Sequence, residues 1–431
     1  MTSTPTSLAE PGTSNTAEDT LRNGWDVVPF LMAISFVGYV NRVSIATAGD
    51  TRIMAQYEIS PTQMGTVYFA FLLTYMICQI PGGLFIDRVR PRLALLTVLV
   101  GSAVFVALTG VVGLTVRDGT TAFAALVVVR GLMGIISAPL FPACASGVGL
   151  WMPAGSRSRT SGLVTGSALV GVAVTPLLFG ALIDLIDWPG AFLIASVATF
   201  ALAVAWSQCV AKDPVHRDSH RDRESSMFAG WWSLLKDRSL ILLTISYGTV
   251  GYFQYLFFYW MNYYFQTVLK LPESRSRAYA AIPPLAMAVG MPLGGWISDR
   301  LEKAYGRRAR RVMPMAGMLF GAILLIVGVM ATEPAWIVMW FALALGVVGT
   351  TEGAFWVTAI EIGGRRRGSS AAIFNTGGNA GGMLAPVMTP WIGQRYGWGY
   401  ALALGALICL VGVFFWLGIR IDERPKGDPV S

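Results

Sequence analysis

The sequence predicts an all-α integral membrane protein with twelve transmembrane helices, arranged as two pseudo-symmetric six-helix bundles. Three observations support this fold class. The 431-residue chain is 54% hydrophobic and only 13% charged, with a mean hydropathy of +0.58, whereas soluble domains are about a quarter charged. Twelve apolar windows are long enough to cross a bilayer. Two sets of short motifs recur at a nearly constant offset along the chain.

The twelve windows each contain about 20 residues or more, and a helix of about 20 residues spans a hydrocarbon core of about 30 Å. They cover residues 27–49, 62–86, 93–116, 121–150, 161–186, 189–211, 239–268, 275–298, 311–331, 335–360, 368–394 and 397–420. We therefore expect an N-terminal bundle over 25–211 and a C-terminal bundle over 239–420. The polar, charged stretch 212–238 is expected to connect them.

The positive charges indicate how the chain is oriented. The net charge is +8, and with the N-terminus in the cytoplasm the loops on that side carry 24 of the 32 Lys and Arg residues. This bias predicts that both termini are cytoplasmic, in the cell (inner) membrane. Residues 1–24 and 421–431 are expected to be cytoplasmic tails, the first of them disordered. The basic excess is thus an orientation signal, and no nucleic-acid partner is expected.

The two halves of the chain repeat one another. The segment 82-GGLFIDR-88 recurs as 294-GGWISDR-300, an offset of 212 residues. A second set recurs at an offset of 210: Gly171, Pro176 and Trp188 match Gly381, Pro386 and Trp398. A six-helix unit repeated in one orientation is typical of transporters, whose substrate site lies near the middle of the membrane between the halves.

The first repeated motif carries a family resemblance. The pattern Gly83-x3-Asp87-Arg88-x3-Arg92 resembles the loop signature of the major facilitator superfamily, and Asp299-Arg300 is similar to its second copy. The resemblance covers essentially the whole chain and implies the major facilitator fold, with two bundles that move about a central cavity. Charges at such a loop can latch one conformation and release another. The alternative is a charge pair that only sets topology.

A closer resemblance is carried by five stretches, 39-YVNRVSIA-46, 75-YMICQIPGG-83, 130-RGLMGIISAPLFPA-143, 355-FWVTAIEIGGRRRG-368 and 374-FNTGGNAGGMLAP-386. They are similar to the anion:cation symporter family, which includes carriers for sugar acids, hexuronates and aromatic carboxylates. The resemblance implies a set of substrate-binding positions: Tyr39, Arg42, Tyr75, Gln79, Arg130, Asn375 and Asn379.

Arg42 and Arg130 are also candidates on physical grounds. A charged side chain at the centre of a membrane helix costs about 3 kcal/mol or more. Helical rise places Arg42 about 22 Å from the cytoplasmic start of its window and Arg130 about 13 Å from the outer start of its own, at similar depth. The planar guanidinium fork suits a carboxylate. The alternative is structural: either arginine could hold helices together, and Arg130 could cap or pair within its own bundle.

Polar residues of two later windows complete the candidate lining. Gln254 and Tyr255 lie in the seventh window, where aromatic density is also typical of helix packing. Asn375 and Asn379 are spaced i, i+4, so they share one helical face, and hydrogen bonding between helices is an equal alternative for them.

The resemblance fails at the positions where a coupling proton is expected. Proton-coupled members have acids at two positions that are Asn41 and Ser137 here, and neither side chain can carry a proton. One carboxyl remains deep in a window, that of Glu352, and burial disfavours its charged form. We therefore expect Glu352 to carry the coupling proton. The alternative is an arginine partner, or a hydrogen bond to Thr350 or Thr351.

These observations predict a secondary active transporter that imports an organic anion (a sugar acid, a hexuronate or another carboxylate) together with a proton or other cation. We expect a monomer in the lipid bilayer. An anion or organophosphate exchanger and a non-transporting anion sensor remain as alternatives. A drug exporter is disfavoured because Thr175 replaces a glycine of the exporter motif. No nucleophile, metal or nucleotide motif indicates an enzyme, so no cofactor, metal site or catalytic residue is expected.

Overall fold

The computed structural model describes residues 15–153, 156–210, 234–364 and 367–420. Within these ranges all regular structure is helical. The N-terminal half contains α1 (Asn15–Ala48), the π-helix η1 (Gly49–Ile53), α2 (Met54–Tyr57), α3 (Pro61–Ile77), α4 (Gln79–Thr115), α5 (Gly119–Ser137), α6 (Leu140–Trp151) and α7 (Arg157–Cys209). Residues 1–14, most of the predicted connector and the predicted C-terminal tail lie outside the described ranges, and α1 includes residues 15–24.

The C-terminal half begins after the connector. It contains α9 (Arg238–Tyr263), the π-helix η3 (Tyr264–Val268), α10 (Glu273–Tyr305), the 3₁₀-helix η4 (Arg307–Arg311), α11 (Val312–Met330), α12 (Pro334–Gly349), α13 (Glu352–Gly363), α14 (Arg367–Gly382), α15 (Ala385–Tyr396) and α16 (Trp398–Leu417). Helix ends are fixed locally. Asp118 and Asp237, for example, cap α5 and α9 by accepting hydrogen bonds from backbone N–H groups.

The helices supply the twelve predicted spans. Nine segments of the described chain are long and apolar enough to cross a membrane, and α3 with the start of α4 makes a bent tenth, kinked by 49°. α7 counts as one of the nine, but its 53 residues would extend about 80 Å, more than twice the thickness of a bilayer core. The chain turns inside it at Asp187, whose φ is 61°. α14 and α15 occupy the window predicted as the eleventh span, residues 368–394.

The internal repeat is visible in backbone geometry. Asp187 and Gly397, which are 210 residues apart, both have positive φ, and each precedes the tryptophan of its repeat. Gly171 and Gly381 each lie against the first helix of their own half. A Cβ atom at Gly171 would lie 2.7 Å from the carbonyl oxygen of Phe36, and one at Gly381 would lie 1.9 Å from that of Gly248. The same close helix pair is therefore built twice.

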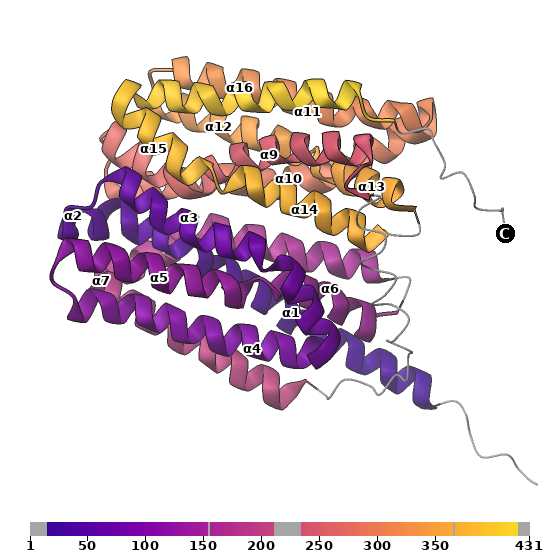
Figure 1. Ribbon diagram of the computed structural model, residues 1–431, viewed down its shortest axis with the longest axis horizontal. Coiled ribbons are helices and arrows are strands. Elements are labelled where there is room, and N and C mark those ends of the chain that lie inside the picture. The colour runs from indigo at the N-terminus through magenta and orange to yellow at the C-terminus, as the bar shows by residue number, and fades with distance from the viewer. Residues whose placement is uncertain (1–14, 154–155, 211–233, 365–366, 421–431) are drawn as a thin grey trace, which may run out of the picture.

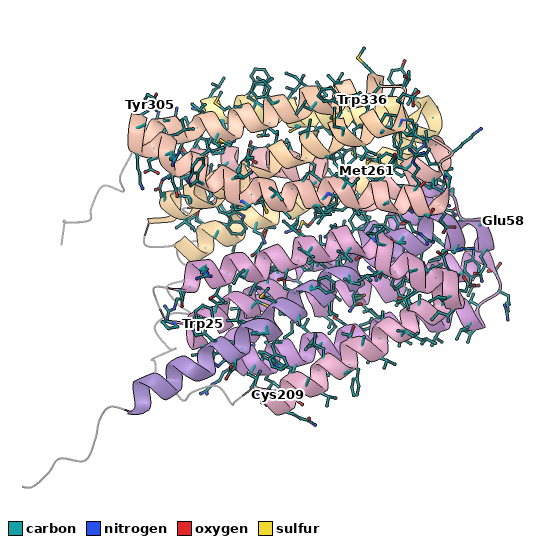
Figure 2. The ribbon with its side chains drawn as sticks, turned by 180° about the vertical axis from the view of Figure 1, so that it is seen from behind. Trp25, Glu58, Cys209, Met261, Tyr305 and Trp336 are labelled. Atoms are coloured by element: carbon teal, nitrogen blue, oxygen red, sulfur yellow. The ribbon has the colours of Figure 1, made fainter. Side chains whose placement is uncertain are left out.

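The two halves lie side by side, with α3 facing α14 and α15 across the boundary (Figure 1). Large apolar side chains cover the outer faces of the bundle: the exposed fractions of Val128, Val197 and Phe414 are 58%, 69% and 68%. Such a continuous apolar exterior suits lipid rather than water. The start of α1 and the end of α16 lie at one end of the bundle, called here the terminal end, and α2 lies at the other, called the α2 end (Figure 1). Figure 2 shows Trp25 and Glu58 at these opposite ends.

The halves touch closely at the α2 end. A Cβ atom at Gly65 of α3 would lie 2.0 Å from the carbonyl oxygen of Pro386, so only glycine permits this approach. The Thr62 hydroxyl donates to Gln394 Oε1 at 2.7 Å. In the described part of the chain, hydrogen bonds between the halves extend from here to the level of Gln79 and Asn375, and no further toward the terminal end.

An ion cluster closes the α2 end on its other side. Arg277 of α10 pairs with Asp184 of α7 and with Glu273. Arg52 of η1 lies 3.3 Å from Asp184 and 3.7 Å from Glu273. Each charge in this cluster faces charges of opposite sign, three elements take part, and the pairs cross between the halves. This conformation is therefore closed at the α2 end.

Candidate substrate-binding site

Arg42 lies at the boundary between the halves, near the middle of the bundle. Its side chain is only 4% exposed. Nη2 donates a hydrogen bond to the hydroxyl of Tyr255, on α9 of the other half, and Nη1 donates to the hydroxyl of Tyr39 at 3.4 Å. No carboxylate of the described chain forms an ion pair with it. A full positive charge is thus buried here with neutral partners only.

Aromatic rings surround this guanidinium. Its central carbon lies 5.2 Å from the ring centroid of Tyr39, 5.6 Å from that of Phe71, and 5.0 Å from those of Tyr75 and Tyr255. Ring faces attract a cation, but each contributes only about 0.5–2 kcal/mol. The rings therefore hold the charge in place without neutralising it, and they form apolar walls around it.

Amide side chains extend the site across the boundary. The Tyr255 hydroxyl donates to Asn379 Oδ1 at 2.8 Å, and Asn375 Nδ2 donates to Gln79 Oε1 at 2.9 Å. Seven of the predicted site residues thereby meet in one cluster: Tyr39, Arg42, Tyr75, Gln79, Tyr255, Asn375 and Asn379. Close packing of α9 on α14 brings them together, because a Cβ atom at Gly251 would lie 2.1 Å from the carbonyl oxygen of Gly378.

Arg130 has a different environment. Its side chain is 1% exposed and lies behind α1, where Nη1 donates to the carbonyl oxygen of Asn41 at 3.2 Å and Nη2 to that of Arg42 at 2.7 Å. These bonds lie within the N-terminal half and match the structural alternative for this residue. They fix the backbone from which the Arg42 side chain projects.

Gln254 and Glu352 form a separate pair. Gln254 Nε2 donates to Glu352 Oε1 at 2.5 Å, and the Tyr247 hydroxyl donates to Oε2 at 2.9 Å. Glu352 is 5% exposed and stands at the start of α13, just after the helix break at Thr350 and Thr351. Neither alternative partner is used among the described side chains: none of their arginines pairs with Glu352, and both threonine hydroxyls bond to backbone carbonyls of α12.

Asn41 and Ser137, which stand where proton-coupled members of the family have acids, are both buried. Asn41 Nδ2 donates to the hydroxyl of Thr199 on α7 at 2.9 Å, and Asn41 and Ser137 are 2% and 8% exposed. Asn41 therefore joins two helices of one half. Among the residues that the structure describes, no three His, Cys, Asp or Glu side chains are grouped to hold a metal ion.

The predicted gating loops lie toward the terminal end. Arg92 donates to the carbonyl oxygens of Ser207 and Val210 at 2.6 and 3.0 Å and so caps the end of α7. Gly83 faces open space, since no atom lies within 4 Å of a Cβ atom placed there. Three further members of the motif, Arg88, Asp299 and Arg300, are exposed, with Arg300 over the Trp296 ring at 3.8 Å; the Asp87 side chain lies outside the described residues.

One buried acid escaped the sequence reasoning. Asp50 directly follows the predicted first window, which ends at residue 49, and sequence alone suggests a loop position. In the structure Asp50 belongs to η1, is 6% exposed, and accepts a hydrogen bond from Asn262 Nδ2 of the other half at 3.2 Å. A charged residue one position beyond an apolar window was the available signal.

Two repeated helical halves, closed together at one end of a lipid-facing bundle around a buried unpaired charge, define a membrane transporter. The chain belongs to the Major Facilitator Superfamily, whose family model matches residues 31–364. The family, the fold class and the non-enzymatic class that the sequence predicted are thereby confirmed.

Two named transporters and one solved structure are similar to this chain. The chain is 26% identical over 415 residues to a probable L-galactonate transporter of Escherichia coli, which covers 93% of this chain and 89% of that protein. It is 25% identical over 448 residues to a D-galactonate transporter of Escherichia coli O6:H1, covering 98% and 99%. Its fold resembles the crystal structure of a bacterial homologue of the human lysosomal transporter Spinster in an inward-facing and occupied conformation, with a TM-score of 0.75, 16% identity, and coverage of 92% and 97%.

Proposed function

We propose that this protein is a secondary active transporter that imports an organic anion, a sugar acid, hexuronate or other carboxylate, across the cell (inner) membrane by alternating access. One observation carries the proposal: Arg42 is buried at the boundary between the halves without an anionic partner. A transported carboxylate would supply the missing charge. The names of the galactonate transporters among the relatives support this substrate class.

The rest of the site suits a hydroxylated anion. The guanidinium fork would take the carboxylate in bidentate fashion, and its remaining N–H groups would keep the hydroxyls of Tyr39 and Tyr255 as partners. Gln79, Asn375 and Asn379 offer amide donors and acceptors for substrate hydroxyl groups. Arg130 would hold Arg42 in position without touching the anion.

The charge bias of the loops supports an orientation. With both termini in the cytoplasm, the α2 end faces outward, and the described conformation is inward-facing. Import then requires the α2 end to open and the terminal end to close. We propose that the gating loops, with Asp87, Arg88, Asp299 and Arg300, come into contact when the terminal end closes.

Proton coupling is proposed at Glu352, because its buried carboxylate has neutral partners only. The substitution Glu352→Gln should abolish the pH dependence of accumulation while uptake down an anion gradient continues. Unchanged accumulation and unchanged pH dependence would remove Glu352 from the mechanism.

The anion proposal is tested with purified, reconstituted monomeric protein. A thermal-shift screen against sugar acids, hexuronates, hydroxy acids and aromatic carboxylates should identify a stabilising anion, and Arg42→Ala should remove that stabilisation. Proteoliposomes should then accumulate the same anion when the outside is acidic. Stabilisation only by neutral or cationic compounds would overturn the proposal. A strict requirement for a counter-anion inside the vesicles would indicate an exchanger instead.

A further inference from the structure

Asp50 is a buried acid outside the site around Arg42, and its hydrogen bonding is incomplete. Its carboxylate is 6% exposed, and the amide of Asn262 is the one side-chain donor that reaches it, on Oδ2. Its other oxygen, Oδ1, is buried and has no hydrogen-bond partner. An ionised carboxylate in such a place is costly unless a cation or several donors compensate it.

Other polar groups around Asp50 also lack hydrogen-bond partners. The hydroxyls of Tyr68 and Tyr259 and the Oδ1 atom of Asn262 are also buried without partners. Tyr68 belongs to α3 and lies against the same turn as Asp50, since a Cβ atom at Gly49 would lie 2.4 Å from its hydroxyl. Four oxygen atoms from three elements thus lack a hydrogen-bond partner in one small region between the halves.

Among the side chains that the structure describes, no cation pairs with this acid. Arg52, two residues along on η1, is engaged by Asp184 and Glu273. The groups that face Asp50 from α3 and α9 are neutral: the Tyr68 phenol, and the Asn262 amide with the Tyr263 phenol. Arg130 of α5 acts on Tyr68 but forms no ion pair with Asp50.

We propose that Asp50 is a proton-binding site that controls the outer gate: the α2 end closes when Asp50 is protonated and opens when it is ionised. The step is a simple protonation, in which the carboxylate gains one proton from the outer solution and no other bond changes. The resulting O–H makes Asp50 a neutral hydrogen-bond donor in a region where the oxygens of Tyr68 and Asn262 have no partner. The proposal rests on the proposed function only for calling the α2 end outer.

The sign of the pH effect follows from burial. Asp50 lies in η1, beyond the membrane-spanning stretch Trp25–Ala48, and burial in the closed end raises the pKa of its carboxyl group well above the ordinary value. The closed conformation therefore binds the proton more tightly than the open one. Lowering the pH favours closure, and raising it through the raised pKa favours opening.

Packed rings connect this site to Arg42. The ring of Tyr68 lies 5.1 Å from that of Tyr259, which lies 6.0 Å from that of Tyr255, the hydroxyl partner of Arg42. Tyr255 and Tyr259 are on α9 and Tyr68 is on α3. Opening the α2 end would therefore move the Tyr68 ring away from the rings of Tyr259 and Tyr255. A proton at Asp50 and an anion at Arg42 would then favour the same closed end, which is the behaviour of a symporter.

The test measures the gate itself and needs no substrate. Thr62 and Gln394, hydrogen-bonded across the α2 end, are replaced by Cys in a background in which the four native cysteines are Ser. A short bifunctional thiol reagent then reports closure between about pH 5 and 9, a range in which an ordinary, solvated Asp such as Asp184 stays charged. We expect the crosslinking rate, divided by the reaction rate of a single Cys at position 62 at the same pH to remove the effect of thiol ionisation, to fall as pH rises, by up to about tenfold per pH unit beyond the midpoint.

Variants decide whether Asp50 is responsible. Asp50→Asn, a neutral side chain of the same shape, should crosslink rapidly at every pH, and Asp50→Glu should restore a pH-dependent rate with a shifted midpoint. Asp118→Asn is the control, because Asp118 is an exposed acid that only caps α5, and its loss should leave the pH dependence of crosslinking unchanged. A wild-type pH dependence in Asp50→Asn would overturn the proposal, as would a rate that responds to sodium concentration rather than to pH.

Two readouts keep the outcomes separate. The melting temperature of Asp50→Asn should match that of the parent protein within a few degrees, and the rescue by Asp50→Glu guards against misfolding. If the parent protein binds no anion while its crosslinking depends on Asp50, the transport proposal fails and the gate proposal stands. If anion uptake is normal and crosslinking ignores Asp50, the reverse holds.

Discussion

The surroundings of Arg42 and of Arg130 show how the same residue type can have two different roles in one membrane protein. Both guanidiniums are buried, at 4% and 1% exposure. Arg130 is bonded to two backbone carbonyls within its own half, whereas Arg42 has hydroxyls and ring faces, of which those of Tyr255 come from the other half. Carbonyl oxygens have partial negative charge and fixed positions. Two backbone carbonyls of the fold therefore face Arg130, whereas the proposed partner of Arg42 is a mobile anion.

The largest expected effect is on Arg42. Removing one partner of a desolvated charge pair costs about 2–4 kcal/mol, so Arg42→Ala should weaken anion binding roughly 30- to 1,000-fold. Its melting temperature without anion should not fall, because an uncompensated buried charge is lost. Arg42→Lys, the matched control, keeps the charge without the fork and should show an intermediate affinity by calorimetric titration.

Arg130→Ala should instead lower the free energy of unfolding, by about 2–3 kcal/mol, because two buried carbonyls lose a charged donor. Thermal denaturation of the anion-free protein measures this loss. If Arg130→Ala left stability intact and abolished anion binding outright, Arg130 would belong to the substrate site and the contrast between the two arginines would disappear.

A smaller effect is expected from Tyr255→Phe. The ring over Arg42 stays, but the hydroxyl that joins Arg42 to Asn379 is removed, which is worth about 1 kcal/mol. Anion affinity should fall about fivefold, as measured by titration. Tyr252→Phe is the control on the same helix, since the Tyr252 hydroxyl faces Thr389 within one half, and it should leave the affinity unchanged.

The smallest effect concerns the sulfur beside Arg130. Arg130 Nη1 lies 3.2 Å from the Met133 sulfur, and a thioether is a weak acceptor. Met133→Leu should lower stability by less than about 1 kcal/mol and leave anion binding unchanged. A loss as large as that of Arg130→Ala would mean that the thioether, rather than the carbonyls, holds this arginine.

Sequence reasoning reached the fold and most of the site because both follow from local patterns. Apolar windows and the 210-residue repeat predict twelve spans in two halves, and the motifs place seven side chains that do meet. It could not tell the direction of Arg130 from that of Arg42, since equal depth says nothing about which neighbouring helix a side chain faces. Gln254 illustrates the same limit: adjacent helical residues point about 100° apart, and it faces Glu352 while Tyr255 faces Arg42.

Asp50 was beyond reach for another reason. Its burial depends on the approach of two halves that are more than 200 residues apart, through Asn262. Hydropathy ends the first span before it, and a charged residue at the end of a span is ordinary. Only the closed conformation turns it into a buried acid.

The glycine at position 65 makes this protein unusually easy to hold in its other state. A single added methyl group, Gly65→Ala, would stand 2.0 Å from the Pro386 carbonyl and act as a wedge between α3 and α15. Backbone cannot yield there as a flexible side chain would, so the halves must part. Such a variant should hold the α2 end open and so make the conformation that is open at this end accessible to structural study.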